Sequence, residues 1–441
     1  MRKPEAASGA GVFIRGAGPR AAVSALILAP VLTMGASAQA APDPACLGED
    51  GATIEEARVT EAVPQEILDR SGLIPETESL IRELCAAPDL EAAGTVVERH
   101  GDALWRTAVD RVQETGYAEG DLSAGDDRSL YWARLTMTSA LNRWEPGFEL
   151  DAGDRAALVA DLERRSRGHH DTDFPEVSET SAEPGRASEV SRVIVTGFDP
   201  FGLDDDIRQA NPSGAAALAL DGAILETGEG VAVVEAVLFP VRWRDFTDGM
   251  VEHALLPHYI GDRPVDAVIT LSQGGADWFD LEAHNGAWRG GFPDNETAEA
   301  LETIPVPDGV PTPTPQPQWS DSSLDRPAIV ARTHGAPFPV FDNTMVVEIP
   351  EGESEAVLSP DGPTPGSTAR AGSGGDYLSN EIAYRNTLLR DATGRDIPAG
   401  HVHTPFLALG PGDAVTDPQF EENRATLIGQ IEDIIAAAVR A

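Results

Sequence analysis

Two segments near the C-terminus carry residue types that suit acyl-transfer chemistry. A run of small residues, Gly372 to Asn380, contains Ser379 and leads into a helical pattern. A nucleophile at the start of a helix lies beside unpaired backbone N–H groups and the positive end of the helix dipole, which stabilise an oxyanion. A serine before a helix is also a common plain cap, and that alternative stays open. Farther along, His401 and His403 lie two apart in a strand-like stretch and therefore share one face.

A histidine pair on one face of a strand is also compatible with a metal site. The sequence offers no third ligand at a telling spacing from His401 and His403, so we expect no metal there. A second group, His169 and His170 with the acids that follow them, lies in a polar stretch that would hold ligands poorly.

Two earlier segments end predicted strands with aromatic or polar side chains. Phe198 and Phe201 follow one strand and precede Asn211-Pro212-Ser213; their rings can flank a small flat group or simply belong to the core. Gln273 follows another strand, before a glycine turn that leads to Glu282. A carboxylate there can orient a histidine, although a solvated surface acid would look the same on this segment alone.

The elements that must position these residues alternate between strands and helices. Strand patterns cover residues 192–197, 231–239 and 266–271, and helical patterns cover residues 214–220 and 244–256. Alternation of this kind predicts a mostly parallel sheet covered by helices, with its sites in loops at the strand ends.

The part of the chain before residue 165 has a different pattern. Helical periodicity without strand-like alternation recurs at residues 76–84, 92–112, 129–141 and 154–162. We interpret this part as an accessory helical domain, or alternatively as a substrate-gating or partner-binding module. Two cysteines, Cys46 and Cys85, predict one disulfide in an oxidising compartment, and a catalytic thiol is the alternative.

The N-terminus has the order of a secretory signal. Basic residues precede an apolar run at 21–32, and Ala38-Gln39-Ala40 forms an A-x-A cleavage site. We therefore expect a secreted or periplasmic protein with no membrane span after cleavage. The predicted organisation follows in chain order: signal peptide 1–40, helical accessory domain 41–164, linker 165–190, and α/β domain 191–441, with an irregular Pro/Gly-rich excursion at 297–370.

The charge of the chain excludes one class of partner as the default. Its 441 residues include 73 acidic and 32 basic side chains, which give a formal net charge of −41. So large an acidic excess repels phosphate backbones, and nucleic acid is not expected as a partner.

Taken together, residues 191–441 resemble pyroglutamyl peptidase I, the pyrrolidone-carboxylate peptidase family. The family's T-G-F-x-P-F-G loop and N-P-S match Thr196–Gly202 and Asn211–Ser213. Its G-G…E-R and P-D-N segments match Gly274, Gly275, Glu282 and residues 293–295, its S-A-G-T-Y-V-C-N matches residues 373–380, and its H-V-P matches residues 403–405.

The resemblance implies a three-layer α/β/α sandwich that needs no metal or organic cofactor. Carried over by position, the family's Cys-His-Glu triad falls on Ser379, His403 and Glu282, and its two ring-holding phenylalanines fall on Phe198 and Phe201. We also expect substrate contacts from two further residues of the matching segments, Asn211 and Gln273.

The chain departs from the family at three positions. Serine replaces the nucleophilic cysteine at 379, and Ala283 and Gly291 replace two arginines. Two hypotheses follow: an exported hydrolase that removes N-terminal pyroglutamate, or a related small cyclic amide, through a Ser-His-Glu triad, and a non-catalytic protein that binds pyroglutamyl or other modified N-termini. A different amidase activity is a further alternative.

Overall fold

The computed structural model describes residues 46–116, 120–174, 189–228, 230–275 and 277–439. Residues 1–40, where the sequence predicts a signal peptide, lie outside this range. The described residues belong to one compact unit. None of the helices in these ranges is both long enough and apolar enough to cross a membrane.

The first part of the described chain is helical, as the periodicity predicts. Its helices are α1 (Ile54–Ala57), η1 (Arg58–Thr60), α2 (Ala62–Ser71), α3 (Ile74–Ala86), α4 (Leu90–Val112), α5 (Arg128–Arg143) and α6 (Ala152–Arg165). Apolar side chains from these helices form a shared core that includes Trp105, Trp132 and Trp144. The predicted disulfide is present between Cys46 and Cys85, and it ties the start of the described chain to α3.

The second part contains a seven-stranded sheet with strand order β10-β5-β14-β4-β1-β3-β2. Its strands are β1 (Glu189–Phe198), β2 (Ile224–Glu226), β3 (Gly230–Phe239), β4 (Ala267–Gln273), β5 (Phe279–Glu282), β10 (Val340–Asn343) and β14 (Ala399–Thr404). Most neighbouring pairs are parallel; β2 against β3 and β5 against β14 are antiparallel. The buried strands are rich in valine and isoleucine, as expected of a sheet covered on both faces.

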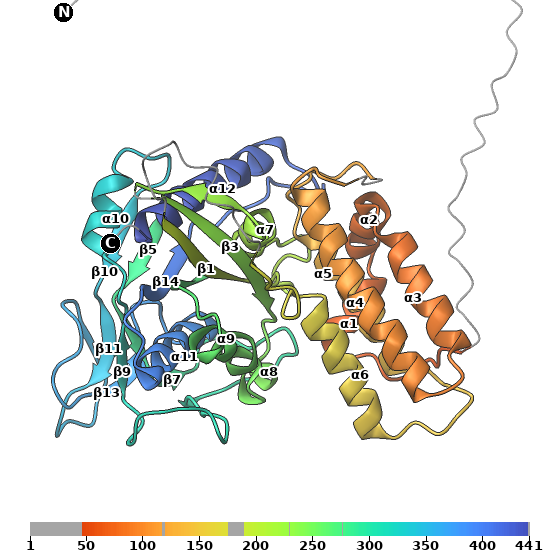
Figure 1. Ribbon diagram of the computed structural model, residues 1–441, viewed down its shortest axis with the longest axis horizontal. Helices are drawn as coiled ribbons and strands as arrows, with labels where there is room; N and C mark the ends of the chain where they lie inside the picture. Colours follow the sequence, from red (N-terminus) through yellow and green to blue (C-terminus); the bar gives the residue numbers. More distant parts are fainter. Residues whose placement is uncertain (1–45, 117–119, 175–188, 229, 276, 440–441) are drawn as a thin grey trace, which may run out of the picture. The chain divides into compact units, whose positions relative to one another are not determined.

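Helices cover both faces of this sheet (Figure 1). Those packed with one face are α7 (Pro212–Leu220), α10 (Arg326–Arg332) and α12 (Pro418–Ala438). Those packed with the other are α8 (Trp243–Thr247), α9 (Met250–Ile260) and α11 (Leu378–Thr393). The predicted α/β class, with a helical region before a mostly parallel sheet, is therefore confirmed.

Residues 297–370 are more regular than the sequence predicts. Short strands here are β8 (Glu302–Thr303), β9 (Trp319–Asp321), β11 (Val346–Ile349), β12 (Val357–Ser359) and β13 (Thr368–Ala371), in addition to α10 and β10. Strands β12, β11 and β13 form an antiparallel sheet, and β8 and β9 pair with β7 (Trp288–Arg289) and β6 (His284–Gly286). Proline and glycine bound these strands without preventing them, so the prediction of an irregular excursion is wrong for these elements.

The predicted linker is also wrong for residues 166–169. Ser166 and Arg167 are fully buried, and the Arg167 carbonyl accepts a hydrogen bond from the Leu238 N–H at the end of β3 (2.9 Å). His169 donates from Nε2 to the Leu238 carbonyl (2.7 Å), and burial lowers the pKa of His169 to about 3. Residues 175–188 of that linker lie outside the described residues.

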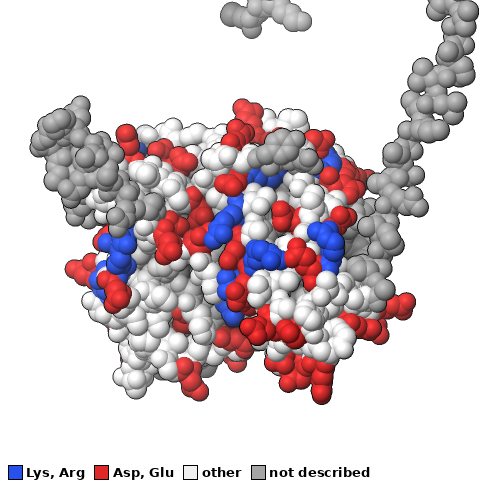
Figure 2. Space-filling view, turned by 45° about the vertical axis from the view of Figure 1, so that its right-hand side comes forward, with Lys and Arg blue, Asp and Glu red and all other residues white. Residues whose placement is uncertain are grey.

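Acidic side chains are prominent on the surface. Figure 2 shows them over much of the face turned toward the viewer, with basic side chains fewer and set among them. This distribution agrees with the acidic excess of the sequence.

Candidate functional site

Three neighbouring strands, β4, β14 and β5, bring the predicted residues together. Strand β14 runs parallel to β4, and the register places His403 opposite Ser272 and Thr404 opposite Gln273. On its other side β14 pairs with β5, which ends at Glu282. Residues far apart in the sequence therefore meet on neighbouring strands of the sheet.

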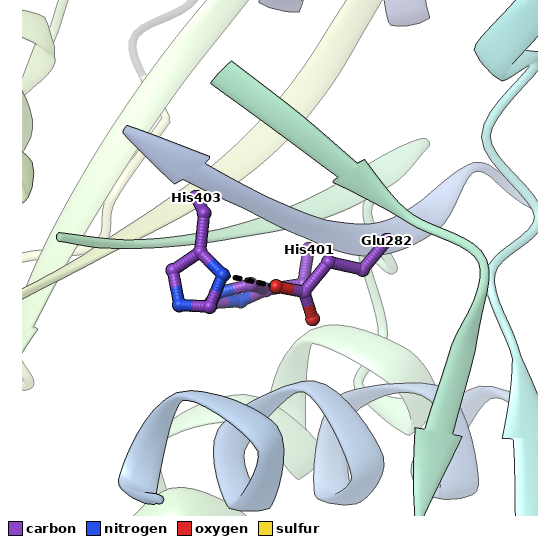
Figure 3. A group of neighbouring side chains, drawn as sticks. All are labelled: Glu282, His401 and His403. Atoms are coloured by element: carbon purple, nitrogen blue, oxygen red, sulfur yellow. Dashed lines mark ion pairs between the residues drawn. The ribbon is translucent and has the colours of Figure 1, made fainter. Parts of the chain in front are cut away.

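Glu282, which is fully buried, and His403, which is mostly buried, form an ion pair through the carboxylate Oε1 and the imidazole Nδ1 (Figure 3). Burial alone raises the pKa of a carboxyl group and lowers that of an imidazole. The mutual attraction of the pair outweighs burial at both groups, so the pKa of Glu282 is lowered and that of His403 is raised. Glu282 thus fixes the ring so that Nε2 is the nitrogen left for proton transfer.

Ser379 lies in the first turn of α11, as predicted from the small residues before it. Tyr377 is the N-cap, so the N–H groups of the first turn lack intrahelical partners. The Ser379 hydroxyl donates to the Gly374 carbonyl at 3.3 Å. Within the described residues no hydrogen bond joins this hydroxyl to His403.

Gly374 connects the serine loop to the ion pair. A methyl group placed on its Cα would overlap both carboxylate oxygens of Glu282. Glycine at this position allows the loop that leads to Ser379 to pass directly over the carboxylate that holds His403. The arrangement thus places Ser379, Glu282 and His403 in one neighbourhood.

A small cavity borders Ser379. Its lining residues are Phe198, Phe201, Asn211, Val241, Ser272, Gln273, Tyr377, Leu378 and Ser379. Its volume of about 30 Å³ leaves room for only one or two water molecules. A five-membered lactam ring is larger, so its binding requires a lining side chain to move. The partly exposed rings of Phe201 and Tyr377, 6.2 Å apart, are the ones best placed to do so.

Four residues that the sequence assigns to substrate binding line this cavity, but one of them is committed to the fold. The Asn211 side chain accepts from the N–H and hydroxyl of Ser213 (3.1 and 2.7 Å) and donates to the Asp199 carbonyl (2.9 Å). These bonds cap α7, so the Asn211 amide is occupied by the protein itself. Phe198 is almost fully buried and stacks on Phe246 at 6.0 Å, which leaves only part of its ring to the cavity.

His401 adds a third titratable group beside the pair. One ligand atom each from Glu282, His401 and His403 lies within 4.8 Å of the others, so the structure brings a carboxylate to the histidine pair that lacked a third ligand in the sequence. Both nitrogens of His401 already lie 2.7 Å from hydroxyls, Nδ1 from Thr270 and Nε2 from Ser272. A metal ion here would have to displace one of these bonds and the Glu282–His403 contact.

The helical region holds the loop that carries the two phenylalanines. Asp199, between them, is buried and accepts from Arg134 of α5 (2.7 Å) and from Arg167 (2.6 Å). Asn295 of the P-D-N segment donates to the Pro200 carbonyl (2.9 Å) and to Glu55 of α1 (2.8 Å). The helical part therefore supports the loop that contributes Phe198 and Phe201 to the cavity wall.

Sequence reasoning missed four of the lining residues: Val241, Ser272, Tyr377 and Leu378. Ser272 directly precedes Gln273 at the end of β4, so its position next to a predicted substrate contact could have identified it. Tyr377 packs edge-on against Trp243 with ring centroids 5.1 Å apart, a contact that no local pattern indicates.

Comparisons with known proteins place the chain in a family. The model of the PA0049 N-terminal domain matches residues 36–163, and that of the PA0049 C-terminal domain matches residues 192–329 and 328–408. The uncharacterized protein PA0049 of Pseudomonas aeruginosa is 34% identical over 465 residues, covering 84% of this chain and 83% of the relative.

Solved structures similar to this chain include two mutant pyrrolidone carboxyl peptidases of Pyrococcus furiosus. One is 19% identical with a TM-score of 0.37, covering 56% of this chain and 97% of its own. The other is 21% identical with a TM-score of 0.38, covering 55% and 98%. The two domain models and the full-length relative agree, and the chain belongs to the PA0049 family.

Proposed function

We propose that the protein is a hydrolase that removes N-terminal pyroglutamate from peptides, or cleaves a related small cyclic amide. The supporting observation is the convergence of separate motif segments on one place. Phe198, Phe201, Gln273 and Ser379 line one cavity, and the loop that precedes Ser379 passes over Glu282, the partner of His403.

The proposed reaction assigns one role to each polar group. Ser379 Oγ attacks the scissile carbonyl while His403 Nε2 takes its proton and then returns it to the leaving amine. Glu282 stabilises the imidazolium, and N–H groups at the start of α11 stabilise the oxyanion. Water then attacks the acyl-enzyme with His403 again as the base, which releases pyroglutamate and restores Ser379.

The first experiment is hydrolysis of pyroglutamyl-aminomethylcoumarin by protein purified without reductant. Wild type should release the fluorophore, and Ser379→Ala and His403→Ala should each abolish release. Matched controls are Ser323→Ala, whose hydroxyl bonds the Ile397 carbonyl, and His253→Ala in α9. No release by wild type at high enzyme concentration would refute the proposal, as would full activity in Ser379→Ala.

The rival function, capture of pyroglutamyl N-termini without cleavage, is favoured by one observation. The Ser379 hydroxyl bonds the Gly374 carbonyl instead of His403, a ground state in which the nucleophile is not activated. Calorimetry with pyroglutamyl peptides tests it: heat of binding without hydrolysis supports capture, and no heat excludes it. In Ser379→Cys, a latent peptidase site should gain thiol-dependent cleavage, whereas a site remodelled for binding should remain inactive.

We also propose that the protein is exported and acts as its mature form. The signal-like sequence at 1–40 motivates this, and a serine in place of a reactive thiol would withstand oxidising surroundings. Cell fractionation of the full chain and of a variant lacking residues 1–40 tests it. Retention of both in the cytoplasm would refute export.

A further inference from the structure

The hydroxyl of Ser272 is one of the polar groups on the cavity wall, and a chain of hydrogen bonds behind it determines where its proton points. The chain begins at Thr270, whose Oγ lies 3.1 Å from the Gly400 carbonyl and 2.7 Å from His401 Nδ1. A carbonyl oxygen can only accept, so we assign the single proton of Thr270 to the bond with Gly400. With this assignment Thr270 Oγ accepts from His401, and Nδ1 carries a hydrogen.

His401 passes this constraint on to Ser272. The imidazole is completely buried, and burial lowers its pKa to about 3, so the ring is neutral and carries one proton. With that proton on Nδ1, Nε2 is a bare acceptor, and Ser272 Oγ at 2.7 Å must donate to it. The only hydrogen-bonding capacity that Ser272 retains toward the cavity is its oxygen lone pairs.

The neighbouring side chain, Gln273, also offers the cavity an acceptor. Gln273 is about nine-tenths buried and lines the cavity, and its Oε1 has no hydrogen-bond partner among the described residues. Burial of an unpaired acceptor costs free energy that a ligand donor would recover. This wall of the cavity therefore presents two acceptors, Ser272 Oγ and Gln273 Oε1, beside the ring of Phe198.

We propose that Ser272 determines specificity by accepting a hydrogen bond from the ring N–H of a cyclic secondary amide, with its own proton held by His401 and Thr270. This inference rests on the proposed function, because it names the substrate group, the ring N–H, that the same cavity recognises. A lactone of the same shape has a ring oxygen where the lactam has N–H. The lone pairs of this oxygen therefore face the lone pairs of Ser272, and no hydrogen bond forms.

The test measures binding of two isosteres, 5-oxoprolinamide and 5-oxotetrahydrofuran-2-carboxamide, to the full chain by calorimetry. Wild type should prefer the lactam by roughly 10- to 100-fold, the ratio expected for one unpaired buried polar contact. Ser272→Ala should bring this ratio to within a few-fold of unity. Thr270→Val should also reduce it, because without the threonine oxygen the His401 proton can move to Nε2 and free the Ser272 proton to face the cavity. Thr270→Ser, which keeps the hydroxyl, is the matched control and should retain the preference.

The outcomes separate this inference from the proposed function. Equal binding of lactam and lactone by wild type overturns the inference even if pyroglutamyl-aminomethylcoumarin is cleaved. A strong lactam preference that disappears in Ser272→Ala and Thr270→Val upholds it even if nothing is cleaved. Binding of neither compound overturns it, and so does covalent labelling of Ser272 by a fluorophosphonate, which would make Ser272 the nucleophile.

Discussion

Replacement of Glu282 by glutamine isolates the contribution of one carboxylate to the site. The amide keeps the size of the side chain and removes its charge beside His403 Nδ1. Because burial alone lowers the pKa of His403 and Glu282 raises it above 6.5, Glu282→Gln should move this pKa below 6.5. An opposite charge at this range typically shifts a pKa by about 1–3 units, or roughly 1.4–4 kcal/mol of interaction free energy.

NMR titration of the His403 ring measures this shift and requires no enzymatic activity. Asp280→Asn is the matched control, since Asp280 lies on β5 like Glu282. Among the contributors to the pKa of His403, Asp280 is the weakest, and it also raises this pKa. Its shift should be clearly smaller than that of Glu282→Gln. If the pKa of His403 in Glu282→Gln equals or exceeds the wild-type value, the assignment of Glu282 as the partner of His403 is refuted.

The same pair predicts how stability depends on pH. The pKa of His403 is raised from 6.5 in the folded protein, so its contribution is complete below 6.5 and is lost as the pH rises through the folded value. The pKa of Glu282 is lowered from 4.5, so its contribution is complete above 4.5 and is lost as the pH falls through the folded value. The loss of unfolding free energy in Glu282→Gln should therefore be largest between about pH 4.5 and 6.5.

Three further substitutions test other parts of the structure. Gly374→Ala should reduce hydrolysis of pyroglutamyl-aminomethylcoumarin at least tenfold, because its methyl group displaces Glu282; unchanged kinetics would contradict the close approach. Cys46→Ser with Cys85→Ser should lower the unfolding free energy by roughly 2–4 kcal/mol in denaturant titration, as expected for a sequence separation of 39 residues. Burial raises the pKa of Glu235 to about 9, so the contribution of this residue to stability falls as the pH rises from 4.5 toward 9. Glu235→Gln should therefore raise the melting temperature more at pH 8 than at pH 5. A larger increase at pH 5 would contradict this direction.

Much of the fold follows from local pattern. The 3.6-residue periodicity of the first part predicts helices that bury one face. The valine-rich runs of the second part predict strands that are buried on both faces. The alternation at His401 and His403 likewise places both rings on one side of β14, with centroids 5.0 Å apart.

The remainder depended on contacts between distant residues. The antiparallel pairing of β5 with β14, which brings Glu282 to His403, reverses the direction expected of a parallel sheet and cannot be read from either segment. Asn211 matched a motif, but the motif does not distinguish a ligand contact from the helix cap that the side chain forms. Residues 166–169 have the composition of a linker, yet hydrogen bonds of Arg167 and His169 hold them against β3.

The two arginines on Asp199 bear on how this protein can be divided. Asp199 is a buried carboxylate whose neutralising charges come from Arg134 and Arg167, both encoded ahead of the α/β region. Expression of residues 191–441 alone would leave this anion unpaired inside the loop that carries Phe198 and Phe201, at a cost of several kcal/mol. The boundary that looks like a natural cut in the sequence is therefore a poor place to truncate the protein. Any ancestor that had the sheet without the helices would have needed a different residue at 199 or a different way to balance its charge.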